Sequence, residues 1–402
     1  MAIGKGNLVV GQSGGPTAVI NNSLVGVIHE ALEHKQIKGI YGMVHGIQGL
    51  LHEELMDLRQ ETPETLMALR DTPASALGTV RYKVKDSDYE RLLEVFIAYN
   101  VRYFFYIGGN DSMDTTNKIS QLAQAKGYEL HAIGVPKTVD NDLAETDHCP
   151  GFGSAARFVA TAIRDTGYDT QSMGNNSPIK FMEIMGRNAG WLTAASALAQ
   201  ETPDDPPHLI YLPERGVSVD QIVADVKAVY KRLSYCVVAV SEGAKDELGN
   251  DLGSGPGDVD AFGHKLKGGV VEFLNQTIKD RLKLSTRYDK PGYLQRSFAS
   301  QQSPVDREEA YQVGRRAVCS AIDGLSGQMV TIQRSLGAEY AATYGLTPLD
   351  KVANMEHTVP AEYINTQGNG VTEAFIHYAR PLIGGPLTHY ARLARHIVTK
   401  RG

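Results

Sequence analysis

The stretch Gly134-Val-Pro-Lys-Thr-Val-Asp-Asn-Asp142 decides both the fold and the site of this chain. It continues a short apolar run from residue 131 that predicts a buried strand. In an open α/β sheet, ligands bind beyond the carboxyl end of such a strand. Asp140 can take a proton from a hydroxyl there, Lys137 can hold an anion, and Asp142 can reach a metal ion. These groups indicate a phosphoryl-transfer site, and a solvated Asp-rich loop is the alternative interpretation.

Composition limits the class of protein. The 402 residues are enough for two lobes, and 40 basic against 46 acidic side chains give a net charge of −6, which argues against a general nucleic-acid surface. The cysteines Cys149, Cys236 and Cys319 lie far apart without metal-ligand spacing, so we expect free thiols in a reducing cytoplasm. No apolar run approaches the roughly 18 residues that a membrane helix needs.

Two further glycine-containing turns follow apolar segments. The strand expected at Asn7–Val10 runs into a turn with Gly14 and Gly15, and helical apolar spacing follows from residue 24 to 32. This order points backbone N–H groups at an anion, although a plain glycine turn before a helix is the alternative. The strand expected at Val101–Ile107 opens into Gly108-Gly-Asn-Asp-Ser112, which predicts a second anion or Mg²⁺ site.

The second half of the chain repeats the arrangement. A strand at Lys180–Met185 leads into Met185-Gly-Arg-Asn-Ala-Gly190, where Arg187 can bind a phosphate bidentately. A strand at Cys236–Val240 ends near Glu242, a carboxylate that suits a sugar hydroxyl. The residues 245–263 are rich in Asp and Gly and predict a loop, and a basic last helix is expected over 389–401.

In this order, the motifs resemble those of the phosphofructokinase family over about residues 7–334. Pro136–Asp142 matches its PKTxDND motif, and Gly14, Gly15 and Asn21 match its first loop, GGxxxGxN. Lys137 and Asp111 stand where the ATP-using members carry glycines, so the chain resembles the pyrophosphate-dependent branch.

The resemblance implies roles on the donor side. Arg81 would contact the phosphoryl donor, and Ser112 would donate to a phosphate. Asp111 would fill the space of a nucleotide and lie near the metal. Asn110 stands where many members hold Mg²⁺ with an aspartate, and its amide oxygen is a weaker ligand.

The resemblance also implies the acceptor side. Asp140 would be the general base on the 1-hydroxyl of fructose 6-phosphate, Thr138 would donate to the transferred phosphoryl group, and Asp142 would support the geometry or the metal. Arg187 would also be catalytic, by contacting the transferred phosphoryl group. The sugar phosphate would be held by Met185, Gly186, Arg187, Glu242, Arg287, Tyr293 and Arg296. Tyr293 stands where ATP enzymes carry histidine, and Arg287 would reach a neighbouring subunit, which implies a homodimer or homotetramer.

We therefore expect two Rossmann-like α/β lobes with mostly parallel sheets and the active site in the cleft between them. The donor lobe would span 1–150 plus about 297–345, and the sugar-phosphate lobe 151–296 plus about 346–402. The implied reaction is reversible, Mg²⁺-dependent transfer of phosphoryl from pyrophosphate to fructose 6-phosphate in glycolysis and gluconeogenesis. The alternatives are an ATP-dependent phosphofructokinase, a non-catalytic regulatory subunit that binds sugar phosphate, and a nicotinamide dehydrogenase, which the missing GxGxxG motif argues against.

Overall fold

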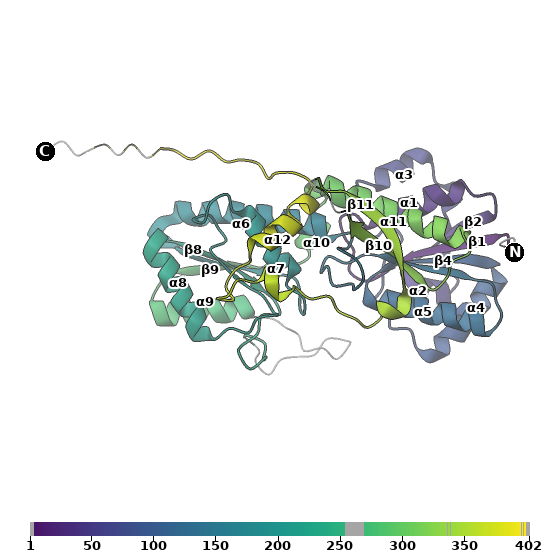
Figure 1. The fold of residues 1–402 in the computed structure, drawn as a ribbon, viewed down its shortest axis with the longest axis horizontal. Helices are drawn as coiled ribbons and strands as arrows, with labels where there is room; N and C mark the ends of the chain where they lie inside the picture. The colour runs from purple at the N-terminus through teal and green to yellow at the C-terminus, as the bar shows by residue number, and fades with distance from the viewer. Residues whose placement is uncertain are drawn as a thin grey trace.

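Two β-sheets with flanking helices form two lobes, which lie side by side along the long axis of the molecule (Figure 1). The computed structural model describes residues 4–253, 269–335, 337, 339–394, 396 and 398. The predicted fold class, two α/β lobes with mostly parallel sheets, is confirmed. Within the described ranges, no helix has the length and the apolar character that spanning a membrane would require.

The first lobe contains a seven-stranded sheet in the order β11-β10-β5-β4-β1-β2-β3. Its five central strands are parallel, and the edge strands β3 and β11 are antiparallel to their neighbours. The strands are β1 Gly6–Gln12, β2 Ile37–Met43, β3 Leu55–Asp57, β4 Val101–Gly108, β5 His131–Pro136, β10 Gln328–Arg334 and β11 Ala342–Pro348.

Helices cover both faces of this sheet because its strands are apolar on both faces. Along β1, Leu8 and Val10 pack into one core cluster, whereas Val9 packs into the cluster on the opposite face. Helices α1 and α11 contribute to the first cluster, and α4 and α5 to the second. The helices of this lobe are α1 Ile20–Leu32, α2 Gly46–Leu51, α3 Pro63–Leu69, α4 Asp86–Ala98, α5 Asn110–Ala125 and α11 Pro304–Ile322.

The second lobe contains a parallel four-stranded sheet in the order β7-β8-β6-β9. One face of the sheet shares a core with helix α6 and with residues 357–383, which we call the C-terminal segment. The other face shares a core with α8 and α9. The strands are β6 Ile179–Ile184, β7 Leu209–Tyr211, β8 Cys236–Ser241 and β9 Thr286–Asp289. The helices are α6 Phe152–Met173, α7 Trp191–Ala195, α8 Val219–Leu233, α9 Val270–Leu282, α10 Leu294–Ser297 and α12 Glu373–Ala379.

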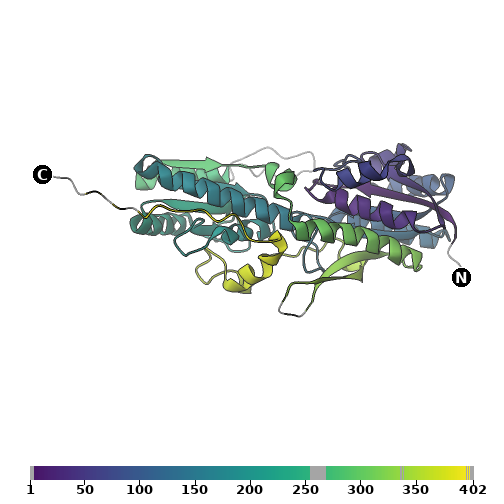
Figure 2. The same cartoon turned by 90° about the horizontal axis from the view of Figure 1, so that it is seen from above.

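The chain passes between the lobes three times. It leaves the first lobe into α6, returns through α11 to β10 and β11, and then crosses again so that α12 packs with the core of the second lobe (Figures 1 and 2). β11 lies in the first sheet and continues past residue 345, where we expected that lobe to end. The lobe boundaries themselves stay a prediction. The 3₁₀ turns are η1 Leu58–Gln60, η2 Gly174–Asn176, η3 Ser196–Ala199, η4 Ala299–Gln301, η5 Leu349–Lys351, η6 Ala361–Tyr363 and η7 Pro381–Ile383.

The predicted basic last helix is wrong in its described part. Residues 389–394 have no helical structure and extend along the second lobe. Tyr390 donates to Asp165 on α6, and Leu393 is 93% exposed, so the Leu393 side chain is not buried against the lobe in the way that would stabilise a helix. Of the Asp- and Gly-rich loop, residues 245–253 are irregular as expected, and 254–263 lie outside the described residues.

Candidate active site

Three loops of the first lobe meet at the carboxyl edge of its sheet. Gln12 pairs with Ile107, and Gly108 pairs with Pro136, so β1, β4 and β5 end side by side. The loops that follow begin at residues 13, 109 and 137, and they contain the three motifs that the sequence singles out. The parallel register therefore brings the two glycine-rich turns next to Lys137.

Lys137 lies beneath the first glycine-rich loop and is only 3% exposed. Its Nζ donates to the carbonyl oxygen of Gly15 at 2.9 Å. Gly14 has a φ of 72°, in the left-handed region that favours glycine, and a Cβ there would lie 3.3 Å from that Nζ. Burial lowers the pKa of Lys137 to about 8, although Asp140 favours the charged form. The side chain therefore remains mostly protonated at neutral pH, and its ammonium can bind an anion.

Asp140 and Asp142 are two carboxylates in one poorly solvated loop. Burial, with the negative charges of Asp142 and Glu242, raises the pKa of Asp140 to about 7, although the positive charge of Lys137 opposes the shift. Its Oδ1 is buried without a hydrogen-bond partner among the described residues. Burial also raises the pKa of Asp142, although the Thr138 hydroxyl donates to it. A carboxyl that titrates near neutral pH with an unpaired oxygen suits a general base.

Thr138 is engaged on both sides in this structure. Its Oγ1 accepts from the backbone N–H of Asp140 at 3.1 Å, and its hydroxyl proton goes to the Asp142 carboxylate. The predicted donation to a transferred phosphoryl group would require this hydroxyl proton to turn away from Asp142.

The second glycine-rich turn begins helix α5. Asn110 Oδ1 is buried without a hydrogen-bond partner among the described residues, whereas Asp111 is exposed in the first turn. Ser112 is 3% exposed, and a Cβ on Gly108 would lie 2.0 Å from its Oγ, so only glycine fits there. The Asp111 carboxylate places its own negative charge at the helix N-terminus, which otherwise attracts anions. A phosphate group that approached the start of α5 would be repelled by the Asp111 carboxylate.

The second lobe contributes the turns after β6 and β8. Gly186, with a φ of 125°, donates its N–H to Glu242 Oε1 at 3.3 Å, and its carbonyl accepts from Ser241 Oγ at 2.6 Å. Arg187 Nε lies 4.0 Å from the same Glu242 oxygen. A Cβ on Gly243 would lie 1.8 Å from the Arg187 carbonyl oxygen, so the two turns pack backbone to backbone. Arg187 and Glu242 are thus fixed as a pair.

Helix α10 brings a second-lobe arginine to the first lobe. The Arg296 guanidinium lies 4.2 Å from the centre of the Tyr293 ring, and a Cβ on Gly15 would lie 2.6 Å from its Nη1. Burial lowers the pKa of Arg296; the positive charge of Arg81 lowers it too, and the negative charge of Asp140 opposes the shift. Arg81, itself exposed, is therefore near enough to share this electrostatic environment.

Arg287 is the predicted residue that the chain does not bring to this cluster. On β9 it pairs with Lys180, at the start of β6, whereas Met185 follows the other end of that strand. Five residues of strand separate the two levels by roughly 16 Å. Arg287 is exposed there. Its predicted contact with a neighbouring subunit stays a prediction.

Two polar residues that support the site were missed in the sequence. Gln295, only 3% exposed, accepts from the Met185 N–H at 3.1 Å and so ties α10 to the turn after β6. Asp306 accepts from the backbone N–H groups of Gly151 and Ser154, both at 2.8 Å, at the start of α6. An isolated Gln between two predicted ligands, and an Asp at a helix start, give no sequence signal for such distant partners.

The chain matches a known family model over residues 7–321, which is described as Phosphofructokinase. The chain belongs to the phosphofructokinase family. It is 46% identical to the pyrophosphate–fructose 6-phosphate 1-phosphotransferase of Xanthomonas campestris pv. campestris (strain B100), over 95% of this chain and 92% of the relative. It is 44% identical to the enzyme of that name from Halomonas elongata, over 98% of each chain. The crystal structure of a pyrophosphate-dependent phosphofructokinase from Marinobacter aquaeolei superposes with a TM-score of 0.87, at 40% identity over 98% of each chain.

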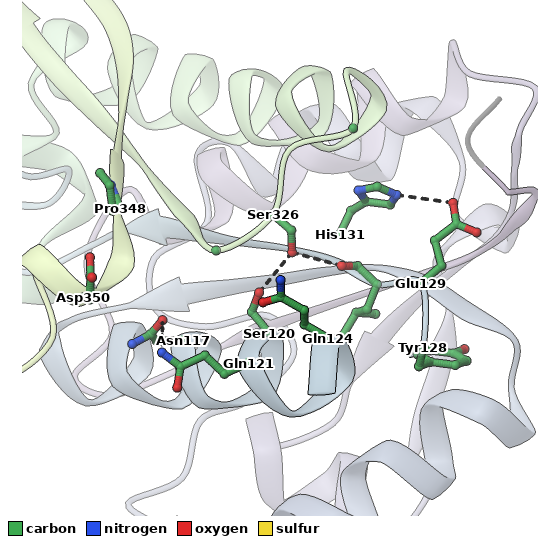
Figure 3. A pocket seen from close by; sticks show the side chains of 13 residues that line it. Asn117, Ser120, Gln121, Gln124, Tyr128, Glu129, His131, Ser326, Pro348 and Asp350 are labelled. Carbon is green, nitrogen blue, oxygen red and sulfur yellow. Dashed lines mark hydrogen bonds and ion pairs between the residues drawn. The ribbon is translucent and has the colours of Figure 1, made fainter. Parts of the chain in front are cut away.

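A cavity of about 450 Å³ in this phosphofructokinase lies at the opposite edge of the first sheet (Figure 3). It is beside the start of β5 at His131, whereas the predicted site follows the end of β5. Its lining includes the carboxylates Glu129 and Asp350 and no lysine or arginine, so it does not suit a phosphate ester. It is lined by Asn117, Ser120, Gln121, Gln124, Tyr128, Glu129, Leu130, His131, Gly324, Ser326, Gly327, Pro348 and Asp350.

Proposed function

We propose that this phosphofructokinase transfers a phosphoryl group from pyrophosphate to the 1-hydroxyl of fructose 6-phosphate. The observation that carries the donor assignment is Lys137, a buried ammonium under the glycine-rich loop, with Asp111 at the start of α5. The names of the relatives support the same donor. A regulatory subunit without catalysis is disfavoured, because such a chain has no need for a buried carboxylate as costly as Asp140.

In the proposed reaction, a bond forms between O1 of the sugar and phosphorus, and the bridging P–O bond of pyrophosphate breaks. Asp140 takes the proton of the 1-hydroxyl, and inorganic phosphate leaves with the electron pair of the broken bond. Lys137 and Arg296 offset the charge that develops on the phosphoryl oxygens, and Arg187 orients them. Because one phosphoanhydride is exchanged for one phosphate ester, the enzyme is expected to run in both directions.

Magnesium is the proposed cofactor, and the oxygen atoms present suit it. Asn110 Oδ1 is buried and unpaired among the described residues, and the carboxylate of Asp111 follows it at the exposed start of α5. When bound, Mg²⁺ would neutralise phosphate charge. One cluster of potential metal-binding side chains lies within the described residues: Glu30 on α1, His34 just after that helix, and Cys319 on α11. Arg315 forms an ion pair with its carboxylate, Glu30, so we assign it no metal.

The reaction is tested by following ³¹P resonances of fructose 6-phosphate, pyrophosphate and Mg²⁺ with the full-length enzyme. We expect fructose 1,6-bisphosphate and inorganic phosphate in equal amounts, and the reverse conversion from those two products. Hydrolysis of pyrophosphate without a new sugar phosphate would overturn the proposed acceptor.

The donor assignment is tested separately with the double variant Asp111→Gly and Lys137→Gly. Removing both side chains should open space for a nucleotide and admit ATP as a donor. A double variant that binds fructose 6-phosphate normally and ignores ATP would contradict the assignment of selectivity to these two positions.

A homodimer or homotetramer that shares Arg287 between subunits is part of the proposal. Light scattering after gel filtration measures the mass in solution. Arg287→Ala should weaken the binding of fructose 6-phosphate in an oligomer, and a monomeric enzyme with full affinity would contradict the shared arginine. A cytoplasmic location likewise stays a prediction, supported by the free thiols Cys149, Cys236 and Cys319.

A further inference from the structure

The residue between the two site carboxylates, Asn141, is held by the C-terminal segment. Asn141 is fully buried and has a φ of 56°, a left-handed conformation that asparagine tolerates better than most residues. Its Oδ1 accepts from the backbone N–H of Cys149 at 2.9 Å, and its Nδ2 donates to Tyr378 Oη at 2.8 Å. Both ends of the amide are used, so the side chain has one orientation.

The direction of these hydrogen bonds is fixed by chemistry. A backbone N–H can only donate, so the amide oxygen faces Cys149 and the amide NH₂ faces Tyr378. The Tyr378 hydroxyl accepts from Asn141 and gives its own proton to the carbonyl of Asp147 at 2.8 Å. One phenol of α12 therefore joins two points of the loop that contains the site carboxylates.

The Tyr378 ring is itself immobilised. It stacks on Tyr363 at 5.5 Å between ring centres and lies 5.3 Å from Trp191. The Arg334 guanidinium lies 4.9 Å from the ring centre and donates to the Tyr378 carbonyl at 3.0 Å. A phenol packed on several sides gives its hydroxyl a defined position.

A second bond from the C-terminal segment reaches Asp142. The backbone N–H of His357 donates to the Asp142 carbonyl at 2.8 Å, and the His357 carbonyl accepts from Trp191 Nε1 at 2.9 Å. Trp191 begins α7, directly after the turn that contains Arg187. The C-terminal segment thus bridges the carboxylate loop of one lobe and the Arg187 turn of the other.

We propose that Tyr378 is a positioning residue for Asp140 and Asp142, acting through Asn141. The inference rests on the proposed function, in which Asp140 is the base. Residues matched by the family model end at 321, whereas Tyr378 and His357 lie beyond that point. The C-terminal segment therefore serves catalysis by setting the orientation of a loop that it supports from outside the matched region.

The test compares Tyr378→Phe with Tyr363→Phe in the full-length enzyme. Tyr378→Phe keeps the packed ring and removes the hydroxyl. Tyr363 is a matched control, because its ring stacks on Tyr378 and, within the described residues, no hydrogen bond joins its hydroxyl to the loop. A misplacement of catalytic groups by about 1 Å costs roughly a hundredfold in rate. Because Tyr378→Phe keeps the packed ring, we expect a smaller displacement, which should lower kcat about tenfold with little change in either KM.

Two further measurements separate positioning from loss of folding. Rates are taken well below the melting temperatures of both variants, so that an effect on stability alone leaves kcat unchanged. Asn141→Gly keeps the left-handed backbone and should lower kcat by a similar factor, and the double variant should lose no more than either single one. Equal kcat in Tyr378→Phe and Tyr363→Phe, or additive losses in the double variant, would overturn the inference. If the wild-type enzyme used ATP, the donor assignment would be wrong instead, and kcat of the same variants would then be measured with ATP as the donor.

Discussion

Two groups of buried charges, one at Lys137 and Asp140 and the other around His148, differ in how their members are paired. At the site, Lys137 makes one hydrogen bond to a carbonyl, and Asp140 has a buried oxygen without a partner among the described residues. Behind the loop, His148 lies between Asp147 at 2.7 Å and Glu309 at 2.6 Å. The second group, which we call the His148 network, comprises Asp147, His148, Glu309, Arg334 and Tyr340.

The pKa shifts follow the pairing. Burial alone would lower the pKa of His148, but Glu309 and Asp147 outweigh it and raise the pKa to about 9. At the site, burial prevails and moves the pKa of Lys137 down and that of Asp140 up. The charged groups of the His148 network have partners of opposite charge, so they stay ionised and stabilise the fold. Lys137 and Asp140 are partly neutral until a bound ligand favours their charged forms. We infer that unpaired burial marks the groups that face the substrate.

The largest effect is expected from Asp140→Asn, which removes the base and keeps its shape. It should lower kcat about 10³-fold while fructose 6-phosphate still binds. Initial rates and calorimetric titration with the sugar phosphate measure the two quantities. Asp142→Asn is the matched comparison and should cost less. Near-normal turnover in Asp140→Asn would remove Asp140 from the role of base.

The same substitution should stabilise the protein. The pKa of Asp140 is about 7 in the folded state against an ordinary value of 3.8. Between these values the folded state holds a proton that the unfolded state releases, so the wild type loses stability as pH rises through this window. Asp140→Asn does not pay that cost, and its melting temperature at pH 8 should exceed that of the wild type. A lower melting temperature would indicate that the carboxylate is paired after all.

Lys137→Met should raise the KM for pyrophosphate roughly 10- to 100-fold, because a charge-assisted hydrogen bond is lost. It should also change the pH profile. In the wild type, kcat/KM should rise as Asp140 ionises near pH 7 and fall as Lys137 loses its proton near pH 8. The variant should lose the basic limb, and its acidic limb should move to higher pH because Lys137 no longer favours the Asp140 carboxylate. An unchanged basic limb would assign it to another group.

A smaller effect on substrate binding is expected from Tyr293→Phe. The ring under Arg296 remains, and only a hydroxyl at a 65% exposed position is removed. The KM for fructose 6-phosphate should rise about fivefold, the value of one ordinary hydrogen bond. Tyr288→Phe, at an exposed position of β9, should leave that KM unchanged. Equal behaviour of the two variants would exclude the Tyr293 phenol from the phosphate site.

The smallest effect on turnover is expected from Glu309→Gln, within the His148 network. Removing one charge should leave His148 insufficiently paired and lower the free energy of unfolding by about 3–5 kcal/mol. Turnover of the folded enzyme should stay near the wild-type value. Denaturation in urea and initial rates below the melting temperature check the two statements. A large loss of kcat without loss of stability would contradict the claim that the paired charges of the His148 network serve the fold rather than turnover.

Local sequence was sufficient for the strands that end at the site. Val101–Ile107 and Lys180–Met185 were predicted from dense apolar runs, and β4 and β6 occupy nearly those residues. The meeting of Lys137 with the two glycine-rich turns depends on the strand order β5-β4-β1, which the local pattern did not predict. The prediction depended on short spacing and on the apolar character of buried strands.

Contacts between distant segments could not be predicted in this way. Glu309 reaches His148 across 161 positions, and Tyr378 reaches Asn141 across 237. A lone Tyr or Glu on an amphipathic helix gives no sign of such a partner. The extended path near Tyr390 was missed for a related reason, because its anchor, Asp165, lies on another helix. Pairing of buried charges is a tertiary property, and it appears only when the chain is folded.

The most direct test is a pair of initial-rate measurements on the wild-type enzyme with fructose 6-phosphate and Mg²⁺, one with pyrophosphate and one with ATP. We expect turnover with pyrophosphate and none with ATP, because we propose that Lys137 and Asp111 occupy the positions that a nucleotide would need. Turnover with ATP alone would contradict the assignment of Lys137, which is buried and makes no ion pair within the described residues, to the anion of pyrophosphate.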